Sequence, residues 1–247
     1  MRISSWIVLL ALVGCAPNLR EATGASGALA VNTGGPWSST IYLGMTEGGA
    51  VAFDLGVDGD GSALREGLER IGADTGELAA VFLTHSHRDH MAAWRSARGA
   101  PFHVAASEVP ALTGVADHRG LVPRFVESID PFDRPSPGTL ELRLFWSDTA
   151  FVIGADTIHA YPLPGHTAGS AAYLFRDVLF VGDAVGYTPL IGFHGAKGIY
   201  SDDAERSDHA LAGLPARLRG RDVLWVCTAH GKCARPWEVF EGWSAEH

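Results

Sequence analysis

The densest group of chemically active residues in the sequence is the segment 84–90, THSHRDH, which holds His85, His87, Asp89 and His90. His85 and His87 are two residues apart, so on an extended chain both side chains point to the same side and can bind one metal ion. Asp89 and His90 follow where the chain turns into a predicted helix, and they can bind a second ion beside the first. The alternative, a polar solvated turn, leaves this concentration of imidazole and carboxylate groups unexplained.

Two metal ions need more ligands than these four, and three later residues supply them. His166 lies in PLPGHTAGS, Asp183 ends the apolar run VLFVGD, and His230 follows another apolar run in VLWVCTAHG. Each alone is compatible with an ordinary polar residue at a turn or strand end. Because α/β sheets place ligands at the carboxyl ends of their strands, the recurrence of such residues predicts one composite site.

The elements that position these residues are short β-prone runs separated by glycine turns. Helical spacing of apolar residues predicts a helix at 61–72 with Ser62 as its cap, and further helices are predicted at 91–99 and 202–218. Strands are predicted at 28–33, 39–45, 50–56, 78–84, 101–107, 139–146, 150–156, 157–163, 170–176, 177–183 and 222–228.

Residues 110–138 are the least regular part of the sequence, with prolines at 110, 123, 131, 135 and 137. These prolines argue against a continuous helix or a central strand. Two interpretations remain open for this segment, a lid over the site or a simple surface connection.

The composition is that of a globular α/β protein that acts on a small molecule. The chain has 247 residues, is 47% hydrophobic and carries a formal charge of −9. A nucleic-acid partner requires a basic face, and no cluster of lysine and arginine is present. The oligomeric state does not follow from the sequence.

The N-terminal residues have the layout of an export signal, with Arg2, an apolar run at 7–13 and Cys15 behind a small residue. The segment LVGC resembles the bacterial lipobox, so we expect a signal peptide at 1–14 and a lipidated Cys15. A tether at 15–27 and a metallo-hydrolase domain at 28–247 would follow. This predicts a lipid-anchored protein of the bacterial cell envelope, at the outer membrane and facing the periplasm. An ordinary cleaved signal is the alternative.

Export also changes the interpretation of the two remaining cysteines, Cys227 and Cys233. In an oxidising compartment they form a short-range disulfide or remain two free thiols. The spacing by itself does not decide between these, because a disulfide depends on the distance between the two Cα atoms.

Taken together, the segments THSHRDH, PGHTAGS, LFVGDA and TAHG, with VAFDLG before them, resemble the metallo-β-lactamase-fold superfamily of metallohydrolases. They occur in the family's order and span the region from about residue 50 to 231. The resemblance implies a four-layer αββα sandwich. It also implies that Asp54, in VAFDLG, orients the motif loop through hydrogen bonds.

The resemblance further implies how the ligands divide between two metal ions. His85, His87 and His166 would hold one ion, while Asp89, His90 and His230 would hold the other. Asp183 would bridge both ions. The donor set suits two Zn²⁺ ions, with Fe or Mn as alternatives.

Such a site predicts a binuclear metal-dependent hydrolase that uses a metal-bridging hydroxide, with Asp89 as its catalytic carboxylate. By resemblance, an aspartate at 183 is typical of glyoxalase II-like and lactonase-like members. We therefore expect cleavage of an ester, thioester or lactone of a small molecule. The alternatives are a zinc β-lactamase-type amide hydrolase and a non-catalytic envelope lipoprotein of the same fold. Tyr187 either donates a hydrogen bond to a developing oxyanion or packs its own loop.

Overall fold

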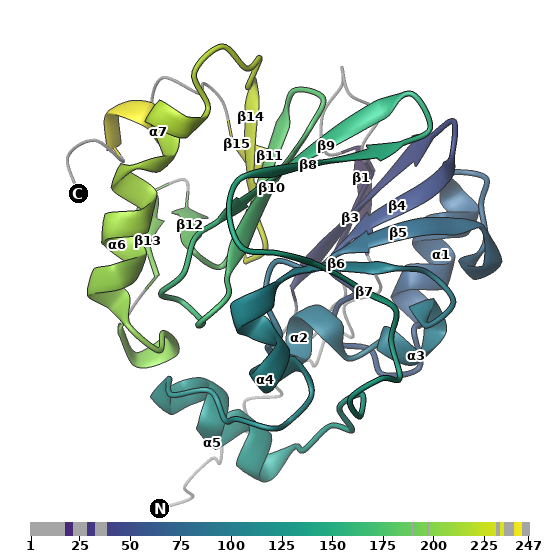
Figure 1. Ribbon diagram of the computed structural model, residues 1–247, viewed down its shortest axis with the longest axis horizontal. Coiled ribbons are helices and arrows are strands. Elements are labelled where there is room, and N and C mark those ends of the chain that lie inside the picture. Colours follow the sequence, from purple (N-terminus) through teal and green to yellow (C-terminus); the bar gives the residue numbers. More distant parts are fainter. Residues whose placement is uncertain are drawn as a thin grey trace, which may run out of the picture.

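Two β-sheets lie face to face and helices cover their outer faces, as the ribbon in Figure 1 shows. The computed structural model describes residues 18–21, 29–32, 39–188, 190–196, 198–230, 233–234 and 240–243. Helices α1 and α3 lie outside one sheet, and α6 and α7 lie outside the other. The predicted four-layer αββα sandwich is confirmed.

In the described part of the chain the first sheet has seven strands in the order β1-β2-β3-β4-β5-β6-β7. Strands β1 to β4 pair in antiparallel fashion, whereas β4 to β7 pair in parallel. The strands are β1 (Asn18–Glu21), β2 (Leu29–Asn32), β3 (Thr40–Thr46), β4 (Gly49–Phe53), β5 (Leu78–Phe82), β6 (Phe102–Ala105) and β7 (Leu142–Phe145).

The second sheet has six strands within the described residues, in the order β15-β14-β11-β10-β9-β8. Only β11 and β14 pair in parallel. The strands are β8 (Thr149–Ile153), β9 (Asp156–Pro162), β10 (Ala171–Phe175), β11 (Val178–Gly182), β14 (Trp225–Thr228) and β15 (Cys233–Ala234), and a separate hairpin consists of β12 (Val185–Thr188) and β13 (Gly192–Gly195).

Three hydrophobic layers hold the sandwich together. The middle layer lies between the sheets and is aromatic, with Phe53 stacked on Phe180 at a centroid distance of 4.1 Å. The outer layers pack the first sheet against α1 and its neighbours and the second sheet against α6 and α7. Strands β5, β10 and β11 are apolar on both faces, as expected for strands covered on both sides.

The helices are shorter than the sequence pattern predicts. They are α1 (Ser62–Arg70), α2 (Arg88–Met91), α3 (Trp94–Ala97), α4 (Val109–Leu112), α5 (Leu121–Ile129), α6 (Ala204–Ala212) and α7 (Leu214–Arg217), with 3-10 turns η1 (Thr75–Glu77), η2 (Ala106–Glu108) and η3 (Gly198–Tyr200). The predicted helix at 202–218 is interrupted at Gly213, just before Pro215, because proline removes a backbone donor. Ser62 is not the cap of α1; Gly61 takes that position in a left-handed conformation.

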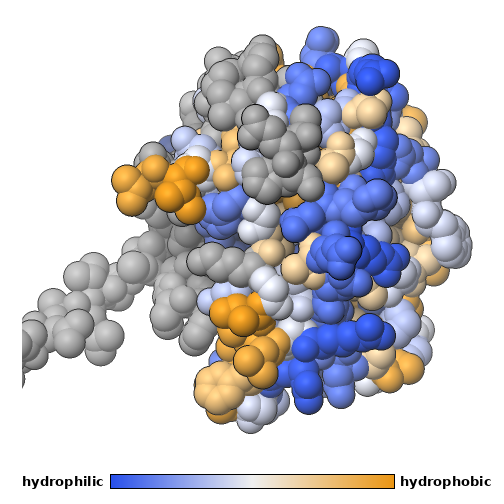
Figure 2. Space-filling model, turned by 90° about the vertical axis from the view of Figure 1, so that its left-hand side faces the viewer, coloured by the Kyte–Doolittle hydropathy of each residue, from blue (hydrophilic) through white to orange (hydrophobic). Residues whose placement is uncertain are grey.

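Segment 110–138 has no continuous helix, as its prolines predict, but it contains the short helix α5, in which Pro123 lies near the N-terminus, where proline is tolerated. No residue of α5 is fully buried. Leu121, Phe125 and Ile129 are at least 60% exposed, and Figure 2 shows hydrophobic side chains gathered over this helix in the lower part of the view. Arg134 joins α5 to the body of the domain through an ion pair with Glu127.

Most of the predicted signal peptide and tether, including Cys15, lies outside the described residues. Residues 18–21 belong to the predicted tether, but they form strand β1 and pair with β2. Strand β1 lies at the edge of the first sheet. Among the described residues, none of the helices is long and apolar enough to cross a membrane.

Candidate metal centre

Three imidazole nitrogens converge at the edge where the two sheets meet. His85 and His87 follow β5, and His166 lies in the turn between β9 and β10. His85 Nε2 is 3.0 Å from His87 Nδ1, which is 3.2 Å from His166 Nε2. All three side chains are at least 95% buried. Backbone bonds fix this edge, including one from the Ala171 amide to the Thr84 carbonyl at 2.9 Å.

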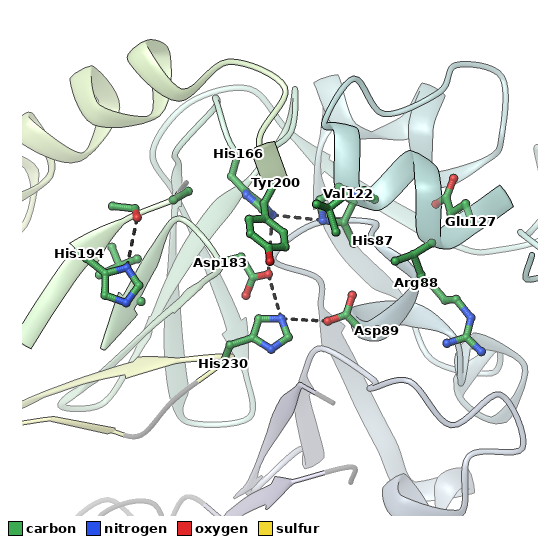
Figure 3. A pocket seen from close by; sticks show the side chains of 16 residues that line it. His87, Arg88, Asp89, Val122, Glu127, His166, Asp183, His194, Tyr200 and His230 are labelled. Atoms are coloured by element: carbon green, nitrogen blue, oxygen red, sulfur yellow. Dashed lines mark hydrogen bonds and ion pairs between the residues drawn. The ribbon is translucent and has the colours of Figure 1, made fainter. Parts of the chain in front are cut away.

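A second group lies beside the first and consists of Asp89, His90, Asp183 and His230. His230 Nε2 is 3.0 Å from Asp89 Oδ2 and 3.1 Å from Asp183 Oδ2. Figure 3 shows both carboxylates directed toward this imidazole. His230 follows β14 and is the most exposed of the group, at 45%.

Asp183 belongs to both groups. Its Oδ2 lies 3.9 Å from His85 Nε2 and 3.7 Å from His166 Nε2 on one side, and 3.4 Å from His90 Nε2 on the other. In each group the candidate ligand atoms lie within 4.8 Å of one another. The structure thus brings together all seven residues that the sequence predicts as ligands, with Asp183 in the shared position.

Asp54 supports the cluster from behind. It follows β4 with a φ of 62°, a left-handed conformation that aspartate tolerates better than most residues. Its Oδ1 accepts from the Thr84 amide at 2.7 Å, and its Oδ2 lies 2.8 Å from His90 Nδ1. The contact turns His90 Nε2 toward the cluster. The expectation that Asp54 orients the motif loop is confirmed by these contacts.

The surroundings of the three histidines in the first group favour their neutral form. Burial, together with the neighbouring imidazoles of His90, His87 and His166, holds the pKa of His85 well below its ordinary value. Burial and His118 do the same for the pKa of His87, and burial lowers the pKa of His166. A neutral imidazole keeps the lone pair that a metal ion requires.

In the second group the pKa values of the two histidines are raised instead of lowered. The Asp183 carboxylate raises the pKa of His230 to about 11. Although burial opposes it, the carboxylates of Asp183, Asp89 and Asp54 raise the pKa of His90 well above its ordinary value. The buried carboxylates in this group therefore require compensating positive charge, which either protons or a metal ion can provide.

The donor chemistry of the cluster fits metal ions. Asp183 Oδ1 and His90 Nε2 are buried, and neither has a hydrogen-bond partner among the residues that the structure describes. A buried polar atom without a partner is costly unless another group binds it. Imidazole and carboxylate donors in two groups that share one carboxylate are well suited to Zn²⁺ or to harder divalent ions.

The cluster forms the floor of a cavity of about 350 Å³. Helix α5 provides one wall through Val122, Pro123, Val126 and Glu127, and the opposite wall comes from the β12–β13 hairpin. Segment 110–138 therefore does more than connect strands, because α5 within it lines the cavity.

Tyr187 does not line this cavity. Its ring packs against Phe193 at a centroid distance of 5.0 Å, so the packing alternative describes it and the predicted oxyanion contact does not. Tyr200 is among the residues that line the cavity instead. The sequence alone does not show which of the two tyrosines lines the cavity.

The sequence analysis missed two buried residues beside the cluster. The ring of His118 lies 4.3 Å from that of His87, and Glu108 hydrogen bonds to the loops on both sides. Neither residue lies in a recognisable motif, and both are distant in sequence from the residues that they contact.

Cys227 and Cys233 form a disulfide, which decides the alternative that the sequence leaves open. They are directly opposite each other on β14 and β15. The bond joins the two strands on either side of the candidate ligand His230.

Comparison with known proteins agrees with this arrangement. Residues 34–230 match the family model described as the metallo-beta-lactamase superfamily. The chain is 25% identical over 186 residues to the probable polyketide biosynthesis zinc-dependent hydrolase BaeB of Bacillus velezensis, with 74% of this chain and 71% of that protein covered. It is 32% identical to a hydroxyacylglutathione hydrolase of Halorhodospira halophila over 62% of this chain, but it spans only 47% of that relative's length.

Solved structures show the same fold at low sequence identity. A metallo-beta-lactamase superfamily protein from Sulfolobus tokodaii has a TM-score of 0.62 at 20% identity, covering 84% of this chain and 79% of that chain. A subclass B3 metallo-beta-lactamase of Bradyrhizobium japonicum has a TM-score of 0.59 at 16% identity, covering 86% and 77%. The chain is therefore a member of the metallo-β-lactamase superfamily of metal-dependent hydrolases.

Proposed function

We propose that this protein is a binuclear metal-dependent hydrolase that cleaves an ester, thioester or lactone of a small molecule. The observation that carries the proposal is the pair of ligand groups sharing Asp183 at the floor of one cavity. His85, His87 and His166 would hold one ion, and Asp89, His90 and His230 the other. Two Zn²⁺ ions are our choice. The named zinc-dependent hydrolase among the relatives supports it.

When bound, two such ions lower the pKa of water and polarise a carbonyl oxygen, which removes the need for a protein nucleophile. The chain's own residues would position the substrate and exclude water from the site. Asp89 lines the cavity, and its carboxylate would accept a hydrogen bond from the attacking water. Tyr200 presents a hydroxyl donor to the same space, in the role first considered for Tyr187.

The cavity walls favour a substrate with a neutral, apolar substituent. Val122, Pro123, Val126 and Val185 supply apolar surface away from the cluster. Arg88 is the only arginine or lysine among the described lining residues, and its guanidinium already pairs with Asp130 at 2.8 Å. Because Glu127 on the same wall is likewise paired, with Arg134, the described lining residues leave no unpaired arginine or lysine for an anionic group on the substrate.

The aspartate at 183, which by resemblance is typical of glyoxalase II-like and lactonase-like members, favours this proposal over its main alternative. Zinc β-lactamase-type amide cleavage remains the second candidate, supported by fold similarity to subclass B3 enzymes, which by itself speaks for the fold alone. The apolar wall, in which Arg88 and Glu127 are both already paired, favours a neutral ester or lactone over a β-lactam, whose carboxylate would find no free arginine or lysine among the described lining residues.

A substrate panel tests the proposal. Residues 16–247, purified with zinc, are assayed against neutral esters, thioesters and lactones of increasing acyl length, together with carboxylate-bearing analogues and β-lactams. We expect turnover of the neutral acyl compounds, with kcat/KM rising with acyl length. Normal metal content without turnover of any compound would overturn the hydrolase proposal, and preferential β-lactam turnover would favour the alternative.

Two variants connect the panel to the structure. Asp183→Ala should lower metal occupancy and hydrolysis together, because it removes the carboxylate shared by both groups. Val126→Ala should reduce the preference for longer acyl groups. Val152→Ala, which changes a valine that is 70% exposed on β8, is the matched control and should leave that preference intact.

We also propose that the protein is anchored to the bacterial envelope through a lipidated Cys15. The support is the export signal and the lipobox-like LVGC, which lie outside the described residues. Lipid attachment should place the full chain in the membrane fraction, with the acyl groups detected by mass spectrometry of its N-terminal peptide. A Cys15→Ala protein that remains equally membrane-bound would contradict the anchor.

A further inference from the structure

Glu108 lies outside the ligand cluster, yet it connects the two loops that carry the histidines of the first group. It ends η2, immediately before α4, and its side chain is fully buried. Its Oε1 accepts hydrogen bonds from the amide and the hydroxyl of Ser86, both at 2.7 Å. Its Oε2 accepts from the Thr167 hydroxyl at 2.7 Å and from the Gly169 amide at 2.8 Å.

The hydrogen-bond partners of Glu108 lie next to the histidines of the first group. Ser86 stands between His85 and His87, and Thr167 directly follows His166. Each oxygen of one carboxylate therefore holds one ligand loop. Ser86 uses its side chain to reach Glu108, while the flanking histidines turn to the metal side, as alternation along an extended segment predicts.

The chemistry of the contact calls for an ionised carboxylate. Four donors meet four acceptor positions, and only a carboxylate accepts at all of them. An amide would turn an NH₂ group toward a backbone N–H on one side or the other. Among the ion pairs of the described residues none includes Glu108, so hydrogen-bond donors alone surround its charge within the protein.

The loop that follows His166 comes close to the backbone of Glu108 at Gly169. A Cβ placed on Gly169 would lie 2.3 Å from the Glu108 amide nitrogen and 2.6 Å from its Cβ. Only glycine permits the His166 loop to come this close to η2. Arg134 completes the arrangement by donating to the Ser86 carbonyl at 3.0 Å.

We infer that Glu108 is the positioning residue of the first metal group, fixing the distance between the His85–His87 loop and His166 before a metal ion binds. The inference rests on the proposed function in one respect, that these histidines bind metal. Without Glu108, the metal ion itself must order the two loops, so its affinity falls. Because the hydrogen bonds of Glu108 go to Ser86, Thr167 and Gly169 and not to residues of the second group, that group keeps its affinity.

The test measures metal affinity site by site in the full chain. Zn²⁺ affinity is obtained by competition with a chromophoric chelator, and the Co²⁺ absorption spectrum reports the geometry of each site. His166→Ala and His230→Ala identify the signals of the first and second groups. Glu108→Gln should weaken the first group by about 10–100-fold, the usual effect of losing a residue that orients ligands. Glu141→Gln, at an exposed glutamate that pairs with Arg143, is the matched control and should leave both groups unchanged.

Thr167→Val, which removes one donor and keeps the side-chain shape, provides a second measurement if the Glu108→Gln protein does not fold. It should weaken the same site by a smaller factor. Unchanged affinity at the first group would overturn the inference, as would an equal loss at both groups. A wild-type protein that binds two ions but hydrolyses nothing would overturn the proposed hydrolysis alone, whereas one that binds no metal would overturn both.

Discussion

His103 provides a test of whether histidines outside the motifs are structural. It is 4% exposed on β6, and its ring lies between Phe82 and Phe151 at centroid distances of 4.5 and 4.4 Å. Burial lowers its pKa to about 4. A histidine in such an aromatic layer must be neutral in the folded protein, so folding and its protonation compete.

The sign and size of the effect follow from that pKa. Between pH 6.5 and about 4 the unfolded chain binds a proton at this residue and the folded protein does not, so stability falls as the pH falls. The resulting loss of unfolding free energy between pH 8 and pH 5 is about 2 kcal/mol, and it approaches about 3 kcal/mol near pH 4. Above pH 6.5 the residue contributes no pH dependence.

The perturbation is His103→Phe, which keeps an aromatic ring in the layer and removes the titrating group. Urea unfolding with EDTA present, at pH 8 and pH 5, measures the free energy of unfolding without metal linkage. The wild-type protein should lose about 2 kcal/mol more than the variant over this range. The other buried histidines titrate in both proteins and cancel in the comparison. Equal pH dependence of the two proteins would refute the reasoning.

Three further results are expected. Reduction of the Cys227–Cys233 disulfide, followed by alkylation, should lower the free energy of urea unfolding by about 2 kcal/mol, because the short loop regains entropy in the unfolded chain; an unchanged midpoint would argue against the bond. Gly169→Ala should cost about 1–3 kcal/mol, since the new Cβ would meet the Glu108 backbone. Gly99→Ala, with no atom within 4 Å of the new Cβ, is its control in thermal unfolding. Exhaustive chelation should abolish hydrolysis and added Zn²⁺ should restore it, whereas activity that survives chelation would contradict metal dependence.

The candidate metal ligands were predictable because most of them are close together in the sequence. His85, His87, Asp89 and His90 lie within six consecutive residues directly behind a buried strand, a spacing that predicts metal binding. His166, Asp183 and His230 were predictable for a related reason, since each follows a recognisable apolar strand or turn and strand ends of this kind gather at one edge. The sequence by itself thus determined the superfamily, the layered fold and the residues that meet at the cluster.

Only the tertiary structure decided which remaining side chains take part. Glu108 is 22 residues from Ser86 and 59 from Thr167, and no local pattern specifies contacts at such separations. The same holds for the choice of Tyr200 over Tyr187, because small differences in loop packing turn one ring into the cavity and the other against Phe193. Ligand identity is a property of residue type and spacing, whereas orientation arises from packing between segments that meet only once the sheets have assembled.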